Sequence, residues 1–225
     1  MNIKDFKILK SKDRFQFSCS CCGNCCRNRE DILLSTYDII RICKELNISV
    51  KQLIDKYGEL YIGHTSKLPL IRLKPQGIYR SCPFLFNNKC LIQKCKPSVC
   101  ALYPLGRVVE QGKEKVQYFL QDTHCQPNTQ TFTLNEWLDK SIELESEKCF
   151  ICWTKLTGTL SEFSREVVKQ SSKETKEQLY TLMCDIMYGE YDADSDYVKQ
   201  IEKRYKSALD FVGEAKKLLE DMELV

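Results

Sequence analysis

The feature that most constrains this chain is the stretch CSCCGNCC at residues 19–26, in which five of eight residues are cysteine. The whole chain of 225 residues contains 14 cysteines, far more than an ordinary globular protein of this size. So many sulfurs in so short a segment have three principal uses: disulfide bonds, reactive thiols or a metal centre.

The compartment helps to choose among these uses. The N-terminal stretch MNIKDFKILKSKDRFQF is polar and lysine-rich and lacks the apolar segment of a secretory signal peptide. No apolar run approaches the roughly 18 residues that a membrane span requires. We therefore expect a cytoplasmic protein with no membrane contact, in which thiols stay reduced. Clustered cysteines are then more often metal ligands or redox groups than disulfides.

Charge and motif content exclude several classes of function. With 34 basic and 31 acidic residues the formal net charge is only +3, so the total charge gives no case for nucleic-acid binding. The sequence contains no P-loop, no G-x-S-x-G elbow, no H-E-x-x-H and no G-x-G-x-x-G. Nucleotide-driven and serine-hydrolase mechanisms therefore have no support.

The cysteines form two clusters. In the first, the spacing C-x2-C-x2-C-C matches the short turns that let paired thiolates reach one metal, with Gly23 at the turn and Cys21 as an additional thiol. Its four members are Cys19, Cys22, Cys25 and Cys26. The second cluster is interspersed with prolines and asparagines and should lie on turns. It comprises Cys82, Cys90, Cys95 and Cys100, followed by Cys125.

The remaining cysteines are more ambiguous. Cys43 and Cys184 fall singly on apolar helix faces, which favours small buried core residues. Cys149 and Cys152 form a further C-x2-C pair that could be core, a redox dithiol or part of a third site. His124 precedes Cys125 and could be a ligand, although an ordinary loop histidine is the simpler interpretation.

Both clusters resemble a known family. FSCSCCGNCC is similar to the opening of YkgJ-type cysteine-cluster proteins, a zinc- or iron-chelating family with a CxxCxxCC signature. CPFLFNNKCLIQKCKPSVCALYP resembles the second motif of that family, although Gln93 and Lys96 depart from its usual residues and Cys21 and Cys95 look like additions. The resemblance implies eight metal ligands: Cys19, Cys22, Cys25, Cys26, Cys82, Cys90, Cys100 and Cys125.

Eight thiolates are too many for one tetrahedral ion or one four-cysteine cluster. Neighbouring side chains of an extended segment point to opposite sides, so we expect Cys25 and Cys26 to serve two nearby centres. One four-cysteine site with spare thiols is the alternative. Iron–sulfur clusters would give the cysteine excess a purpose, but the ferredoxin spacing is absent and zinc suits four thiolates equally well.

The expected fold is α+β: a small, loop-rich, metal-centred unit with a few short strands, followed by a helical C-terminal part. A capping box at Ser35 and Asp38 predicts a helix over residues 35–47, and Ser49 predicts another over 50–60. Strands are predicted at 68–74 and 115–121. Helices should then begin at the caps Thr133, Ser161, Ser172 and Ser195. The composition shift near Phe132 suggests two domains, 1–131 and 132–225.

The sequence thus predicts a cytoplasmic metal-binding protein that holds iron–sulfur or zinc centres through two cysteine clusters, for electron transfer or metal handling. Two alternatives stay open. One is an iron-dependent protein-modifying enzyme similar to flagellin lysine N-methylases, whose helical C-terminal region would present a protein partner or substrate. The other is an interaction module in which zinc only supports the fold.

Overall fold

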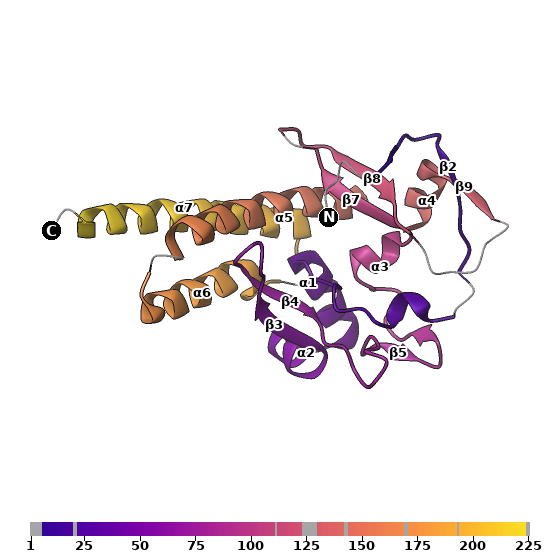
Figure 1. The fold of residues 1–225 in the computed structure, drawn as a ribbon, viewed down its shortest axis with the longest axis horizontal. Coiled ribbons are helices and arrows are strands. Elements are labelled where there is room, and N and C mark those ends of the chain that lie inside the picture. Colours follow the sequence, from indigo (N-terminus) through magenta and orange to yellow (C-terminus); the bar gives the residue numbers. More distant parts are fainter. Residues whose placement is uncertain are drawn as a thin grey trace.

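The computed structural model has a mixed α+β fold, with small antiparallel sheets toward one end and long helices toward the other (Figure 1). The predicted class, including its helical C-terminal part, is confirmed. The structure describes residues 6–19, 22–110, 112–122, 130–141, 144–168, 171–192 and 194–223.

Helices α1 (Thr36–Leu46) and α2 (Val50–Tyr57) begin at the predicted serines. Each N-terminus carries a complete capping box, because the cap hydroxyl accepts from the third backbone N–H and the third side chain accepts from the backbone N–H of the cap. The predicted second helix ends early: its last predicted residues instead form strand β3 (Gly58–Ile62), which pairs antiparallel with β4 (Pro69–Leu73).

A second group of strands lies at the other side of the cysteine region. Strands β1 (Ile8–Leu9), β8 (Val116–Leu120) and β7 (Leu105–Val109) form an antiparallel sheet in that order. Strand β2 (Arg14–Gln16) pairs with β9 (Thr131–Thr133), and the ladder leads directly into α4, which spans Leu134–Ser141. An aromatic-rich cluster beneath these elements includes Phe15, Phe17, Leu102, Leu105 and Tyr118, with Trp137 packed against it.

Between the two groups, the chain from Cys82 to Leu105 is turn-rich, as predicted. It contains the two-residue hairpin strands β5 (Leu85–Phe86) and β6 (Lys89–Cys90) and the short helix α3 (Ser98–Leu102). The first cysteine cluster contributes a single 3-10 turn, η2 (Asn24–Cys26), which lies beside β5 and below α3 in Figure 1.

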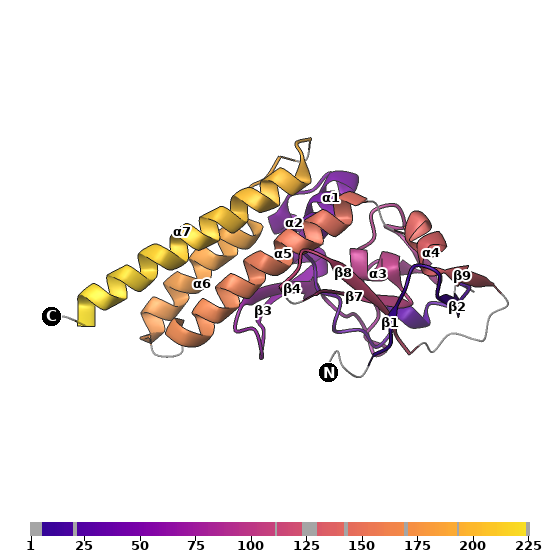
Figure 2. The same cartoon turned by 90° about the horizontal axis from the view of Figure 1, so that it is seen from above.

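The C-terminal part is helical. Helix α5 (Leu144–Phe163) continues into a π-helical segment, η3 (Ser164–Val168), and is followed by α6 (Lys173–Tyr188) and α7 (Tyr197–Glu223). These helices run side by side away from the sheets, and α7 reaches the far end of the molecule (Figure 2). The main hydrophobic cluster joins α5 and α6 to α1 and β4, so the helices share their core with the cysteine-bearing part.

The predicted helix starts were partly right. Ser172 caps α6, and Thr133 caps α4 by accepting from the Glu136 N–H at 3.3 Å. Ser161 is wrong as a cap, because it lies inside α5 and donates instead to the Ser66 carbonyl. At α7, Asp196 rather than Ser195 accepts the Lys199 N–H, at 3.0 Å. The predicted domain boundary stays a prediction of the composition.

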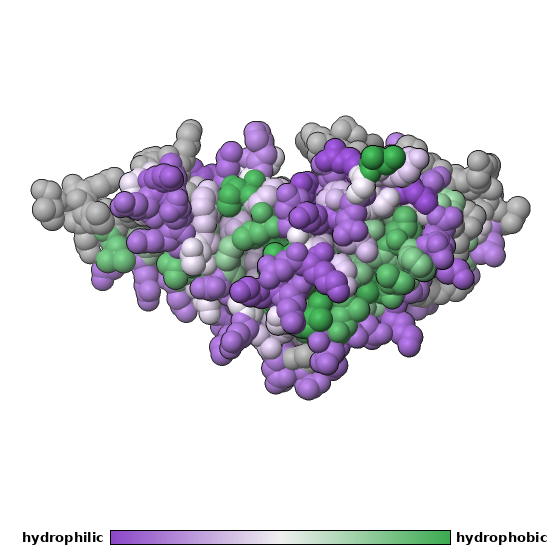
Figure 3. All heavy atoms as spheres, turned by 90° about the horizontal axis from the view of Figure 1, so that it is seen from below, coloured by the Kyte–Doolittle hydropathy of each residue, from purple (hydrophilic) through white to green (hydrophobic). Residues whose placement is uncertain are grey.

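The surface is chemically mixed. The face seen from below shows hydrophobic patches over its centre and right-hand part, between groups of hydrophilic residues (Figure 3). Exposed apolar side chains flank the second cysteine motif, among them Ile78, Phe86 and Leu91. None of the helices in the described part of the chain is long and apolar enough to cross a membrane.

Candidate metal centre

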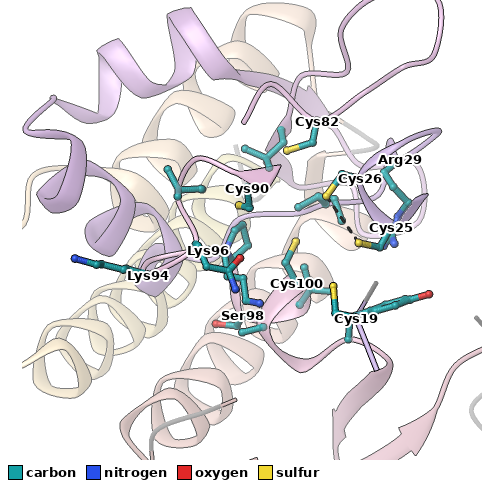
Figure 4. A pocket seen from close by; sticks show the side chains of 18 of the residues that line it. Cys19, Cys25, Cys26, Arg29, Cys82, Cys90, Lys94, Lys96, Ser98 and Cys100 are labelled. Carbon is teal, nitrogen blue, oxygen red and sulfur yellow. Dashed lines mark hydrogen bonds between the residues drawn. The ribbon is translucent and has the colours of Figure 1, made fainter. Parts of the chain in front are cut away.

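The two cysteine motifs meet at one cavity of about 890 Å³. Seven of the eight predicted ligands line it: Cys19, Cys22, Cys25, Cys26, Cys82, Cys90 and Cys100. The eighth, Cys125, lies outside the described residues, as do Cys21 and His124. Figure 4 shows sulfurs from both motifs facing the same space. The fold therefore brings together thiols that are more than 50 residues apart in the sequence.

Gly23 shapes the first motif. Its φ of 74° lies in the left-handed region that favours glycine, and it starts the 3-10 turn in which the Cys26 N–H donates to the Gly23 carbonyl at 3.0 Å. A Cβ at this position would come within 2.7 Å of Nη1 of Arg27. The turn reverses the chain so that the cysteines on either side of Gly23 line the same cavity.

Cys25 and Cys26 are arranged differently from the sequence-based expectation. That expectation assumed an extended segment, whereas the two residues lie in η2 and their Sγ atoms are only 3.8 Å apart. Two thiolates on one tetrahedral metal, with metal–sulfur bonds of about 2.3 Å, lie about 3.8 Å apart. The premise that these side chains point to opposite sides is wrong, and the two-centre prediction loses its argument from this pair.

Hydrogen bonds hold the two motifs against each other. The backbone N–H of Cys82 donates to the Cys26 carbonyl at 2.8 Å. Arg27 bridges the same gap, because its guanidinium donates to the Cys22 carbonyl at 2.7 Å and to Oδ1 of Asn88 at 2.5 Å. The relative position of the two motifs is therefore set by the protein's own contacts.

A buried carboxylate positions the far end of the second motif. Asp38, which is 3% exposed, accepts from the backbone N–H and the hydroxyl of Ser98 at 2.8 and 2.7 Å. It also accepts from the N–H and hydroxyl of Ser35 at the start of α1, at 3.1 and 2.7 Å. The predicted helix cap thus has a second role: it anchors the chain two residues before Cys100 to α1.

Burial governs the protonation of most of these thiols. It raises the pKa of Cys82, Cys90 and Cys100, since a thiolate is poorly solvated there. Cys25 is the exception: a hydrogen bond from the Cys26 thiol, assisted by the positive charges of Arg29 and Lys96, lowers its pKa to about 6. The same hydrogen bond raises the pKa of Cys26. The pair therefore presents one thiolate and one thiol near neutral pH.

The donor chemistry suits a thiophilic metal. Seven cysteine sulfurs lie at this cavity, and sulfur ligands favour zinc and iron–sulfur clusters. No group of three or more histidine, cysteine, aspartate or glutamate side chains among the described residues is arranged to hold a metal ion. The thiols thus share a cavity, and one pair has the spacing of a tetrahedral edge, but a closed coordination shell would require the other sulfurs to move closer.

The cysteines outside the cavity have other surroundings. Cys43 and Cys95 are buried in the main hydrophobic cluster, which confirms the core interpretation of Cys43. Cys149 is 1% exposed beside Tyr37 and Ile201, with half-buried Cys152 packed against this group. Neither lines the cavity. His64 is exposed in the turn between β3 and β4.

Sequence reasoning missed the cationic lining of the cavity. Five basic side chains line it together with the cysteines: Arg29, Arg41, Lys89, Lys94 and Lys96. Lys94 and Lys96 flank Cys95 within the second motif, so the sequence could have indicated a positive charge beside these cysteines. Arg41 comes from α1, and only the fold brings it to this place.

Comparisons with known proteins add no assignment: neither a family model, nor a curated protein, nor a solved structure matches this chain. The resemblance to YkgJ-type proteins therefore stays a prediction from the two motifs.

Proposed function

We propose that this chain is a metal-binding cysteine-cluster protein of the YkgJ type, which binds zinc or iron–sulfur through thiolates from both motifs. The observation that carries the proposal is the convergence of seven cysteines, from segments far apart in sequence, on one cavity. Burial alone does not explain this gathering, because the core cysteines Cys43 and Cys149 are buried in apolar clusters and do not line the cavity.

The spacing of Cys25 and Cys26 supports a particular form of binding. A separation of 3.8 Å between the two sulfurs suits two thiolates on a single metal atom. Zinc with four cysteines binds in this way, and so does each iron of a [2Fe–2S] cluster, whereas a [4Fe–4S] cubane gives each cysteine its own iron. We propose that these adjacent cysteines serve one metal atom, and that the remaining two thiolates of a four-cysteine site come from among Cys82, Cys90 and Cys100.

The thiols also suggest a cellular compartment and an order in which the cysteines bind the metal. Free thiols at this density persist in a reducing environment, so we propose a cytoplasmic location. Because metal binds thiolates, binding must displace protons from the buried thiols of the second motif, whose pKa burial raises. Cys25, with its lowered pKa, is the natural first ligand.

The test is metal content and absorption of protein purified anaerobically, for the wild type and for Cys26→Ser and Cys100→Ser. Both variants should lose most of the bound metal. Cys184→Ser is the matched control, since Cys184 is also half-buried but does not line the cavity. Absorbance near 400 nm indicates an iron–sulfur cluster, and metal without such absorbance indicates zinc.

The outcomes separate the alternatives. About one zinc per chain, or the two irons of a single [2Fe–2S] cluster, would refute two centres. A wild-type protein without stoichiometric metal, or equal metal loss in Cys184→Ser, would refute the proposal itself.

A further inference from the structure

The cavity is larger than a metal centre alone requires. Its volume of about 890 Å³ lies in the range of roughly 300–1,000 Å³ that is typical of sites for small molecules. Its lining also has two chemically different parts. In Figure 4 the sulfurs of Cys25, Cys26 and Cys82 lie to one side, and Lys94 and Lys96 lie on the other.

The charges that line this cavity are strongly unequal. Among the described residues, five basic side chains line this space against one carboxylate, that of Asp139. Arg29 forms an ion pair with Asp31 at 2.6 Å. Within the part of the chain that the structure describes, Arg41, Lys89, Lys94 and Lys96 form no ion pair with a carboxylate.

Only some of these basic side chains act on the thiols of the candidate metal centre. Arg29 and Lys96 act on the Cys25 thiol, and their charges would offset that of a thiolate-bound metal. Lys94 points away from the sulfurs in Figure 4. Arg41 acts instead on Cys95. Burial and the carboxylate of Glu45 raise the pKa of this thiol, and the positive charge of Arg41 lowers it. Part of the positive charge is therefore available to a second ligand.

The second part of the lining is partly preorganised. The guanidinium of Arg41 lies 5.0 Å from the centroid of the Tyr37 ring and donates to the Lys94 carbonyl at 3.3 Å. The first contact lies within α1, and the second, a single exposed hydrogen bond, joins α1 to the segment that carries both lysines. We call Arg41, Lys94 and Lys96 the cationic flank. Preorganised basic groups at the edge of a cavity recognise ligands with several anionic oxygens.

We propose that the cationic flank binds a small dianion, with phosphate or paired carboxylate groups, beside the thiol cluster. Binding of this anion requires the flank alone. Its role as a substrate or co-ligand of the metal rests on the proposed function. The flank supplies three positive charges, and the remainder of the cavity holds the rest of the molecule between the flank and the sulfurs.

Calorimetric titration of the reduced protein, metal-free and metal-loaded, tests this. The two probes are phenyl phosphate and succinate, which distinguish a phosphate from a dicarboxylate ligand, and succinamide is the uncharged control. The key variant is Arg41→Gln/Lys94→Gln, because these two cations stand apart from the candidate metal ligands. Lys51→Gln, an exposed lysine on α2 away from the cavity, is the matched control.

We expect saturable binding of at least one dianion and none of succinamide. The double variant should bind roughly tenfold or more weakly, with its thermal midpoint and metal content unchanged, and Lys51→Gln should bind as the wild type does. Absence of saturable binding, equal affinity in the double variant, or loss of metal together with anion binding in that variant would overturn the inference. If instead no form of the protein holds metal while the flank still binds the dianion, the proposed function fails and this inference stands.

Discussion

Replacement of Asp38 by alanine tests whether this carboxylate holds the second cysteine motif in place. The substitution removes two hydrogen bonds that join α1 to Ser98, before Cys100, and two that join Asp38 to Ser35 at the start of α1. Ser98 is 4% exposed, so its N–H and hydroxyl would lose their partner where water reaches poorly. Two buried donors without a partner cost about 1–3 kcal/mol each, and loss of the capping box costs about 1 kcal/mol more. The sum predicts a free energy of unfolding lowered by about 3–7 kcal/mol.

Urea unfolding of the reduced, metal-free protein, followed by circular dichroism, measures this loss. With a slope of about 2 kcal/mol per molar urea, the midpoint should fall by roughly 1.5–3.5 M. Asp55→Ala is the matched control, because Asp55 is exposed on α2. A loss below about 1 kcal/mol for Asp38→Ala, or one no greater than for Asp55→Ala, would show that the Asp38 contacts do not support the motif.

Three further outcomes are expected. Arg204→Ala should destabilise the protein by about 2 kcal/mol in urea unfolding, with little change for the neighbouring Lys203→Ala, since the Arg204 guanidinium donates to four backbone carbonyls at the end of α6. Gly23→Ala should weaken metal binding more than Gly112→Ala in a competition assay with a chelator. Both glycines have left-handed φ, but only at Gly23 would a Cβ meet other atoms; equal effects would count against a special role for this turn. Stability of the metal-free protein should fall as the pH rises above about 9 in a thermal-melt series. Burial raises the pKa of Cys100 and Cys149 above the ordinary value of a thiol, so these groups stabilise the fold while neutral, and this contribution is lost as the pH increases; a flat profile would contradict it.

The sequence predicted those features that depend on neighbouring residues. The capping boxes of α1 and α2 require only a serine and the residue three positions later, and both formed as expected. The pairing of β2 with β9 joins residues more than 100 positions apart, and no local pattern indicates it. Strand β7 was missed for a related reason: it follows a proline-rich stretch, and its pairing with β8 decides its conformation.

The candidate site likewise has features that the sequence predicted and features that only the fold determines. The family resemblance implied eight cysteine ligands, and the fold gathers the seven that the structure describes at one cavity. The orientation of Cys25 and Cys26 was wrong, because the left-handed φ of Gly23 starts a 3-10 turn in place of an extended segment. The cationic flank could not be predicted, since Arg41 reaches the lysines only after α1 packs against the second motif.

X-ray absorption at the metal edge of the anaerobically purified, metal-loaded protein tests the central claim most directly. If thiolates from both motifs bind the metal, its first coordination shell should consist of sulfur at about 2.3 Å. Cys26→Ser and Cys100→Ser should each reduce the number of sulfur ligands, and Cys184→Ser should not. A first shell of nitrogen or oxygen at about 2.0–2.1 Å, or a sulfur shell that all three variants leave unchanged, would contradict the account.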